Sequence, residues 1–300
     1  HGEPTAFDFE PRDHVALGEL LGVLDIERAV RTSGSRFVYL LGDIVLLQFA
    51  LVRHALDILM ARGFTPVIPP VLVREEALYG TGFLPTEAVN IYKTEQDDLY
   101  LVGTSEVPLA ALHMDEILDE EILPRRYAGY STCFRREAGT YGKDLGGMFR
   151  VHQFDKVEMF SFSTPESSWD ELELLVSVEE EILGSLEFPY RVVNIAAGDL
   201  GGSAAKKYDI EAWLPGQGRY RELTSCSNYT DYGARRARTR MRRTGGGVEV
   251  LHTLNGTATA IGRTLIAIME NHQQADGSVA LPAKLHPYLP ESVRVLTPKD

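Results

Sequence analysis

One stretch of the chain combines arginines, carboxylates and an aromatic ring at alternating positions. Arg135 and Glu137 stand at the end of an apolar run, and Arg150, Phe154 and Glu158 follow a glycine-rich segment. Because successive side chains of a strand point to opposite faces, residues an even number of positions apart share a face. Such a face suits an anionic nucleotide: Arg binds phosphate, an aromatic ring stacks on a base, and Glu binds an exocyclic amine or a metal. An exposed antiparallel strand pair with alternating charges fits the same residues.

The elements around this stretch predict a β-hairpin over about 126–162, with its two strands joined by a loop that contains Gly139, Gly142, Gly146 and Gly147. The rest of the chain must supply a partner sheet and the other half of any binding site.

A second candidate follows the strand expected over 219–226. Glu222, Thr224, Ser225 and Ser227 place a carboxylate and small hydroxyls within a few residues. A carboxylate and a hydroxyl at this spacing can hold Mg²⁺ against phosphates. A serine-rich strand end that makes turn hydrogen bonds is the simpler reading.

Two junctions between secondary-structure elements carry further candidates. At 255–263 an expected strand runs into a helix through small residues, and Arg263 lies in the first turns of that helix, within reach of a phosphate or at the surface. At 103–106 Thr104 or Ser105 caps a helix as an ordinary N-cap. In the alternative reading, Thr104 and Glu106 face a ligand that carries an ammonium group.

Six arginines lie within 231–243. The pattern fits an exposed basic helix, and it also fits a contact with a nucleic-acid backbone. The net charge of −13 argues against a general nucleic-acid coat protein, so any such contact is local.

Composition sets the broad class. A hydrophobic share of 44% and a charged share of 24% are typical of a soluble globular protein. Cys133 and Cys226 are the only cysteines, which excludes a disulfide framework and favours a cytoplasmic, reducing location. We expect no membrane partner, because no apolar run approaches the roughly 18 residues of a membrane span.

The order of the elements predicts the fold class. We expect helices over 44–62, 107–118, 166–188 and 262–272, and strands over 64–68, 99–102, 190–196, 208–214, 219–226 and 248–253. The acidic helix over 166–188 is expected to present a solvated outer face. Consecutive strands joined by short turns favour an α+β fold with a mainly antiparallel sheet flanked by helices. Phosphate-binding and hydrolase motifs of the GxxxxGK[ST], GxGxxG, GxSxG and HExxH types are absent from the sequence.

Three segments in this order resemble the three signatures of class II aminoacyl-tRNA synthetases: GFTPVIPPVLV, FRREAG…RVHQFDKVEMF and NGTATAIGRTLIAIMENHQ. Within that class, the GTSE turn, the RELTSCSNYTDYGARR stretch and HTLNG are similar to bacterial-type seryl-tRNA synthetases. The resemblance spans essentially the whole chain. It implies a single class II catalytic domain over 1–300, with a lead-in segment at 1–42, a catalytic core at 43–290 and a tail at 291–300.

The resemblance also implies substrates, cofactors and partners. ATP and Mg²⁺ are the expected cofactors, L-serine and tRNA-Ser the expected substrates, and a homodimer built partly around Pro69 and Pro70 the expected assembly. The expected function is activation of serine to seryl-adenylate, with release of pyrophosphate, followed by transfer of serine to tRNA-Ser. A ligase that passes serine or another small amino acid to a carrier protein or small molecule is the alternative.

Residue roles follow from the same resemblance. Arg135 and Arg263 are the expected catalytic residues. The expected ATP-binding residues are Arg135, Glu137, Arg150, Phe154, Glu222, Leu223, Thr224, Ser225 and Arg263, with Glu222 and Ser225 as Mg²⁺ ligands. The expected serine-binding residues are Thr104, Ser105, Glu106, Arg135, Glu158, Asn255 and Thr257.

The sequence departs from the family pattern in three respects. The family usually carries an N-terminal helical arm that grips tRNA-Ser, and this sequence begins, at His1, just after the place where that arm would end. We therefore expect a segment without the arm. Gly146 stands where an Arg is usual in the hairpin loop, which weakens the expected tRNA contact. Thr257 and Ala258 replace a usual Ser and Gly, a change expected to alter the volume of the serine pocket slightly.

Overall fold

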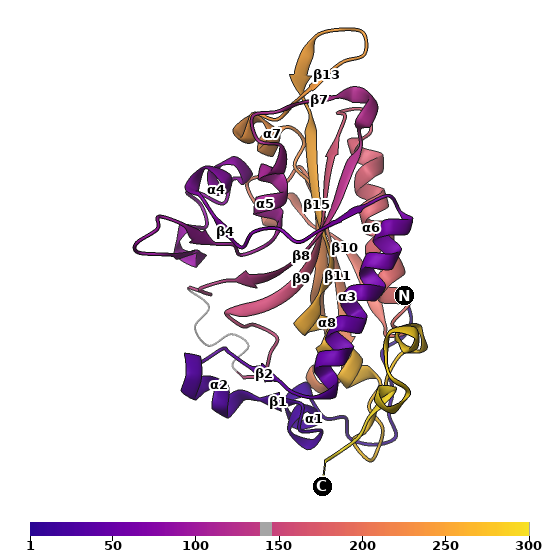
Figure 1. Ribbon diagram of the computed structural model, residues 1–300. Helices are drawn as coiled ribbons and strands as arrows, with labels where there is room; N and C mark the ends of the chain where they lie inside the picture. Colours follow the sequence, from indigo (N-terminus) through magenta and orange to yellow (C-terminus); the bar gives the residue numbers. More distant parts are fainter. Residues whose placement is uncertain (139–145, 300) are drawn as a thin grey trace.

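The structure is a computed structural model that describes residues 1–138 and 146–299 (Figure 1). The predicted hairpin loop therefore lies largely outside the described residues, and only its last residues, Gly146 and Gly147, can be placed.

A large sheet organises the described part of the chain. Seven strands there follow the order β10-β11-β12-β15-β9-β8-β3. Their bounds are β3 Thr65–Val67, β8 Arg125–Phe134, β9 Gln153–Ser163, β10 Tyr190–Asn194, β11 Lys206–Leu214, β12 Arg219–Asn228 and β15 His252–Ala260. All neighbouring pairs are antiparallel except β3 with β8, which is parallel. The predicted α+β class is confirmed, and β3, which corresponds to the strand expected over 64–68, lies at one edge of the sheet.

Helices cover one face of this sheet. They are α3 Asp43–Ala61, α6 Ser168–Gly184 and α8 Ile261–Asn271, which contact the central strands and one another. Val157 and Met159 of β9 point into the main core beneath these helices. On the opposite face, Phe160 and Phe162 pack in a second cluster with Leu109. The cluster lies under the short helices α5 Glu106–Ala110 and α7 Tyr232–Ala237, and the rest of this face is left for the site.

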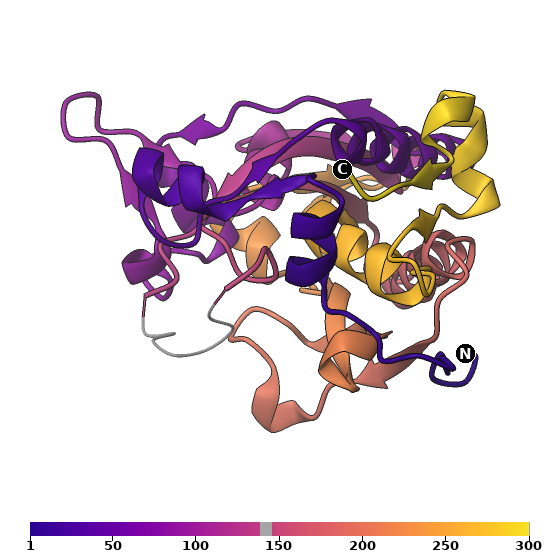
Figure 2. The same ribbon diagram turned by 90° about the horizontal axis from the view of Figure 1, so that it is seen from below.

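Smaller elements surround the sheet. They are α1 His14–Leu20, β1 Leu24–Asp25, α2 Ile26–Ser33, β2 Tyr39–Leu40, β4 Leu72–Val73, α4 Glu75–Thr81, β5 Tyr92–Lys93, β6 Tyr100–Leu101, β7 Ile117–Asp119, β13 Arg240–Arg242, β14 Val248–Val250, β16 Val279–Ala280 and β17 Val295–Leu296. Viewed from below, α1 lies against α8, close to the yellow C-terminal segment (Figure 2).

Both flanking segments pack on the core. Leu17 and Leu21 near the start are fully buried in it, and Leu296 is buried in β17, which pairs with β16. The division into a lead-in, a core and a tail stays a prediction.

The predicted hairpin and the helices over 44–62, 166–188 and 262–272 correspond to β8–β9, α3, α6 and α8. The predicted helix over 107–118 is wrong in its second half. Helix α5 ends at Ala110, and Ile117–Asp119 is instead strand β7, which pairs in parallel with β13. Leu118 is buried with Met241 of β13, so tertiary packing overrides a local helical pattern there. The lead-in also contains α2, whose N-cap Asp25 accepts a hydrogen bond from Arg28 N.

The expectation about apolar runs needs correction. Helix α3 is long and apolar enough, by length and composition alone, to cross a membrane. Of its most apolar 18-residue stretch, 44% is buried inside the protein. Ile44, Leu47, Leu51 and Leu59 are its main buried residues in the core. A core helix passes the same test of length and composition, and α3 packs as one.

Candidate active site

A cavity of about 400 Å³ opens on the sheet face opposite α3, α6 and α8. Its walls come from the ends of β8 and β9, from β12 and β15, and from the 103–106 turn. The predicted hairpin thus supplies one wall, and chain segments more than a hundred residues apart supply the others.

Two irregularities in the sheet aim side chains into this cavity. The pairing of β11 with β12 shifts register where Glu222 and Thr224 face consecutive residues of β11, which makes Leu223 an extra residue. A bulge of this kind reverses the alternation of side chains. Glu222 therefore lies on the same side as Ser225, although the two are three positions apart. A similar shift at Ala258 in β15 accompanies the turn toward Arg263.

Guanidinium groups gather at one end of the cavity. Arg135, Arg150 and Arg263 all line it. Arg135 Nε donates to Gly103 O at 3.1 Å, and its guanidinium lies 5.2 Å from the centre of the Phe154 ring. Arg150 pairs with Glu137, and Arg263 Nη1 donates to Glu222 O at 2.9 Å.

This crowding has an electrostatic consequence. Burial, together with the positive charges of Arg135 and Arg150, lowers the pKa of Arg263, while the charge of Glu222 opposes the shift. Clustered cations in a partly desolvated wall favour an anion that neutralises several of them at once. With Phe154 beside them, the residues form a site suited to a nucleotide phosphate chain and its base.

The other end of the cavity is built from buried acids and amides. Asn255 Nδ2 donates to Glu106 Oε2 and to Glu158 Oε1, each at 3.1 Å. Lys156 Nζ lies 2.5 Å from Glu158 Oε2 and donates to Thr104 Oγ1 at 2.7 Å. Two buried acceptors, Glu106 Oε1 and Asn255 Oδ1, have no protein partner among the described residues. Buried acceptors of this kind are costly unless a ligand donor satisfies them.

Two acidic groups at this end of the cavity have raised pKa values. Burial and the negative charge of Glu158 raise the pKa of Glu106 to about 7. Burial and the charge of Glu106 raise the pKa of the Tyr229 phenol well above its usual range. A cationic ligand group beside Glu106 would favour its ionised form.

Most of the predicted site residues line this one cavity. They are Thr104, Glu106, Arg135, Glu137, Arg150, Phe154, Glu222, Leu223, Ser225, Asn255, Thr257 and Arg263. Three predicted residues do not line it. Ser105 Oγ is buried and donates to Gly129 O, Thr224 Oγ1 donates to Glu179, and Glu158 lies behind Lys156 and Asn255. Glu158 still touches the lining residues, whereas the side chains of Ser105 and Thr224 point into the protein because of their position in the turn and strand.

Other lining residues had no predicted role. Lys156 shares a face with Phe154 and Glu158, so the alternation rule could have included it. Tyr229, Lys207 and Phe149 also line the cavity, and no local motif marks them.

Helix α6, the predicted acidic helix, contains a buried carboxylate. Glu179 of α6 is fully buried and accepts from Thr224 Oγ1 at 2.9 Å. Burial raises the pKa of Glu179 well above its usual range. The expectation of a uniformly solvated outer face is therefore wrong at this position.

The arginine run is not a single basic helix. Helix α7 ends at Ala237, and the chain turns through Arg238, with φ of 55°, into β13. Arg235, Arg238 and Arg243 pair with nearby carboxylates. Arg236 donates to the carbonyl oxygens of Tyr79 and Leu84. Apart from Arg235, whose partner Asp231 lies four residues before it, these arginines hold neighbouring segments together.

The cavity also offers oxygen ligands. Within residues 1–138 and 146–299, groups of three or more His, Cys, Asp or Glu side chains that could hold a metal are absent. Glu222 and Ser225 of β12 nevertheless both line the cavity with a carboxylate and a hydroxyl, and Glu222 lies next to Arg263. Such a pair suits a Mg²⁺ ion that takes its other ligands from a nucleotide and water.

Comparison with known proteins gives consistent matches. A family model described as the tRNA synthetase class II core domain (G, H, P, S and T) matches residues 90–272. The serine--tRNA ligase of Acidothermus cellulolyticus is 59% identical over 298 residues, which cover 99% of this chain and 70% of the relative.

Solved structures match as well. Seryl-tRNA synthetase from Pyrococcus horikoshii, complexed with ATP, has a TM-score of 0.95 at 52% identity, covering 98% of this chain and 66% of that one. The cytoplasmic serine-tRNA ligase of Naegleria fowleri, in complex with AMP, has a TM-score of 0.94 at 39% identity. It covers 100% of this chain and 72% of its own.

Proposed function

The chain belongs to the class II aminoacyl-tRNA synthetases and, within them, to the serine--tRNA ligases, and from this premise we propose that its cavity is where ATP and L-serine react. Serine is activated to seryl-adenylate with release of pyrophosphate and is then transferred to the 3′ end of tRNA-Ser. One observation carries the assignment: a single cavity joins a cluster of guanidiniums to a pair of buried acceptors without protein partners.

The guanidinium end takes ATP. Phe154 stacks on the adenine ring, and Glu137 accepts from its amino group. Arg135 binds the α-phosphate, because it lies over the Phe154 ring and also donates to Gly103 O, next to Thr104 of the acid-lined end. Arg150 and Arg263 bind the outer phosphates, which replace the present partners of these guanidiniums.

The acid-lined end takes serine. Its ammonium group supplies donors to Glu106 Oε1 and its hydroxyl supplies a donor to Asn255 Oδ1, the two acceptors that the protein leaves open. Thr257 and Thr104 complete the wall around the small side chain. Alanine lacks the hydroxyl and would leave a buried acceptor unsatisfied, which penalises its binding.

The chemistry needs no general base. A serine carboxylate is ionised at pH 7, and it attacks the α-phosphorus as the bond to the pyrophosphate oxygen breaks. Arg135 neutralises charge that develops on the α-phosphate, and Arg263 neutralises the departing pyrophosphate. The protein otherwise contributes position, by holding the two substrates in line.

Glu222 and Ser225 are the residues we assign to Mg²⁺. When bound with ATP, the ion supplies further neutralisation of phosphate charge. The Glu222 side chain is 45% exposed and lies 3.8 Å from Arg263 Nη1, so it can turn toward an ion without breaking a buried pair.

The 3′ end of tRNA-Ser needs a path to the cavity. A neighbouring cavity of about 430 Å³ shares Arg135, Glu137, Arg150 and Tyr229 with the first. We assign this second cavity to the terminal ribose of tRNA-Ser, whose hydroxyl must reach the seryl-adenylate carbonyl.

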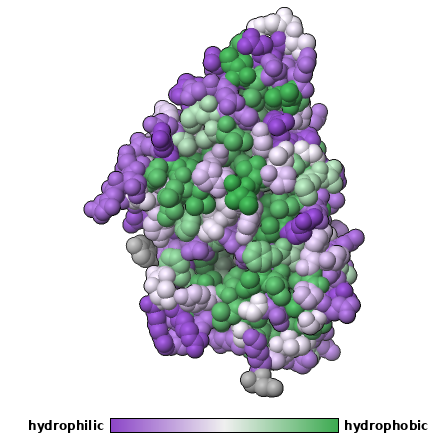
Figure 3. Space-filling view, in the orientation of Figure 1, coloured by the Kyte–Doolittle hydropathy of each residue, from purple (hydrophilic) through white to green (hydrophobic). Residues whose placement is uncertain are grey.

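A homodimer through β3 and α3 is also part of the proposal. Ile68 is 85% exposed beside Pro69 and Pro70, and Phe49 of α3 is 56% exposed. Apolar side chains gather on the face that α3 occupies (Figures 1 and 3). Exposed apolar patches of this kind mark protein interfaces. A second copy would cover them without a membrane, in keeping with the predicted cytoplasmic location.

Amino-acid-dependent exchange of pyrophosphate into ATP tests the proposed function. We expect exchange with serine and little with the other amino acids, followed by transfer to tRNA-Ser. Absence of exchange with every amino acid would contradict activation. Exchange without charging of tRNA-Ser, even with a tRNA-binding arm joined to the chain, would favour the alternative acceptor, a carrier protein or small molecule.

A further inference from the structure

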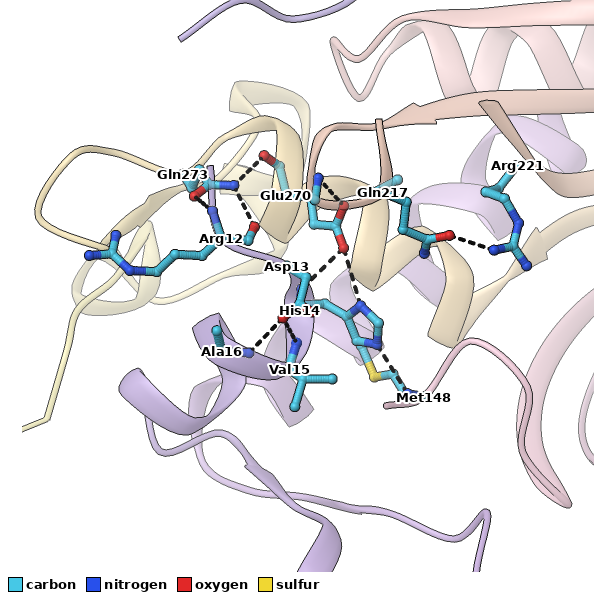
Figure 4. Close-up of polar contacts among 12 residues, drawn as sticks. Arg12, Asp13, His14, Val15, Ala16, Met148, Gln217, Arg221, Glu270 and Gln273 are labelled. Carbon is cyan, nitrogen blue, oxygen red and sulfur yellow. Dashed lines mark hydrogen bonds and ion pairs between the residues drawn. The ribbon is translucent and has the colours of Figure 1, made fainter. Parts of the chain in front are cut away.

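His14 connects two distant parts of the chain in the interior (Figure 4). It is the first residue of α1, and its Nδ1 lies 3.1 Å from Oε1 of Glu270 near the end of α8. On the other side of the ring, Met148 N donates to His14 Nε2 at 3.2 Å. His14 is 6% exposed and Glu270 0%, so water does not compete for either bond.

The hydrogen bonds define the tautomer. A backbone N–H only donates, so Nε2 must accept from Met148 and cannot carry a proton. The hydrogen therefore lies on Nδ1 and points at Glu270. Glu270 also accepts from His14 N at 3.1 Å and from Gly216 N at 3.0 Å. The neutral ring is thus held at both nitrogens.

The chain at Met148 fits closely against this ring. Gly147 has φ of +71°, and a Cβ there would lie 2.1 Å from His14 Nε2. Only glycine allows this approach without strain. The position of His14 therefore determines where the chain returns from the hairpin loop toward β9.

The return point leads directly into the nucleotide end of the cavity. Met148 and Phe149 line it, and the centre of the Phe149 ring lies 3.8 Å from the guanidinium carbon of Arg221 and 4.6 Å from that of Arg263. Arg150 follows and pairs with Glu137. A shift of the Met148 peptide would move Phe149 and Arg150 together.

Glu270 also holds a second segment that leads to the cavity. Its bond to Gly216 N holds the turn between β11 and β12, where Gln217 Oε1 accepts from Arg221 (Figure 4). Glu270 thus holds the turn that leads to Arg221 and, through His14, the chain at Met148. One carboxylate therefore anchors both Phe149 and the arginine that lies over its ring.

We propose that His14 is a positioning residue for ATP: through Met148 it holds Phe149 and Arg150 where the phosphate end of the nucleotide binds. The assignment rests on the proposed function of the cavity. His14 itself touches neither substrate, and the serine end lies on other elements, so its effect falls on ATP alone.

Two substitutions of similar size separate this role from general stability. The longer amide of His14→Gln can place its oxygen where Nε2 lies and accept from Met148 N. The shorter amide of His14→Asn can donate to Glu270 in place of Nδ1 but leaves Met148 N without an acceptor. His286→Asn is the matched control, because His286 is half-buried and its ring contacts Leu281 O, away from the cavity.

Steady-state exchange provides the first readout. We expect His14→Asn to raise the KM for ATP by about tenfold, the effect of losing one buried backbone hydrogen bond, with the KM for serine unchanged. His14→Gln should stay within about threefold of the parent chain, and His286→Asn should match it. Equal effects of His14→Asn and His14→Gln, or an equal rise in both KM values, would overturn the proposal.

Hydrogen exchange of the Met148 amide provides a readout that needs no activity. We expect this amide to be protected in the unmodified chain and in His14→Gln, and to exchange faster in His14→Asn. An unprotected Met148 amide in the unmodified chain would overturn the proposal even if no variant folds. Loss of serine-dependent exchange in the unmodified chain, with Met148 protected, would instead count against the proposed function.

Discussion

Lys156 Nζ lies 2.5 Å from Glu158 Oε2, with side-chain exposures of 8% and 0%, and Lys156 lines the serine end of the cavity. The pair gives the fully buried Glu158 carboxylate a cationic partner, and Glu158 in turn contacts Asn255, which also contacts Glu106. Removing one member of such a pair costs more than removing both, because the remaining charge has no compensation.

We therefore expect Lys156→Met to lower the free energy of unfolding by about 3–5 kcal/mol. The double variant Lys156→Met/Glu158→Gln should recover much of that loss, since no charge is left buried. Urea denaturation of the two variants and the unmodified chain measures the difference. A single variant as stable as the double variant would show that the pair is not the main source of Glu158 stabilisation.

Glu106 should control the affinity for serine. Glu106→Gln removes a charged acceptor for the serine ammonium, which lowers kcat/KM for serine by about tenfold to 150-fold, the value of 1.5–3 kcal/mol for a charged hydrogen bond. The KM for ATP should change little, because the nucleotide binds at the other end. A variant whose KM for ATP rises as much as that for serine would argue against two separate ends.

The pKa of Glu106, raised to about 7 by burial and Glu158, predicts a pH dependence. Below pH 7 the free enzyme gains a proton at Glu106 and loses the charge that attracts the ammonium group. We expect kcat/KM for serine to fall about tenfold per pH unit below 7, and the profile of Glu106→Gln to lack this limb. Identical pH profiles for the two proteins would remove Glu106 from the serine pocket.

The raised pKa of Glu179 predicts how the stability of the folded protein changes with pH. Burial raises its pKa in the folded state well above that in the unfolded chain. Above the unfolded pKa, the folded form keeps a proton that the unfolded form releases. Stability from this group is therefore full at low pH and is lost as pH rises through that window.

Glu179→Gln removes the titration but keeps a partner for Thr224. Relative to the unmodified chain, we expect the variant to gain about 1.4 kcal/mol per pH unit above the unfolded pKa, until the folded group also ionises. Thermal and urea unfolding across pH 5 to 8 measures the slope. A stability difference that does not vary with pH would mean that Glu179 is ionised in the folded protein.

The site illustrates what local patterns can and cannot predict. Strand alternation correctly grouped Phe154 with Glu158, because both lie in β9 and the rule depends only on backbone geometry. Arg135 and Glu137 also line one cavity, but they follow the end of β8 at Phe134 and Glu137 has φ of 50°, so strand alternation is not the reason. It could not predict the bulge at Leu223, which arises from pairing with β11 and brings Glu222 beside Ser225.

Residues that act across long sequence separations were missed for the same reason. Glu179 reads as part of an acidic helix, and only its packing against β12 and β15 buries it. His14 lies 134 residues from Met148 and 256 from Glu270. Neither contact leaves a local signal, so the structure was needed to find them.

The central claim is that this cavity activates serine, and Arg135 tests it most directly. Serine-dependent pyrophosphate exchange should be compared between Arg135→Ala and Arg235→Ala, an arginine paired with Asp231 on α7 outside the cavity. We predict a loss of at least about 100-fold for Arg135→Ala, as for removal of a group that stabilises transition-state charge, and near-normal exchange for Arg235→Ala. Near-normal exchange by Arg135→Ala, in a variant that remains folded, would contradict the account.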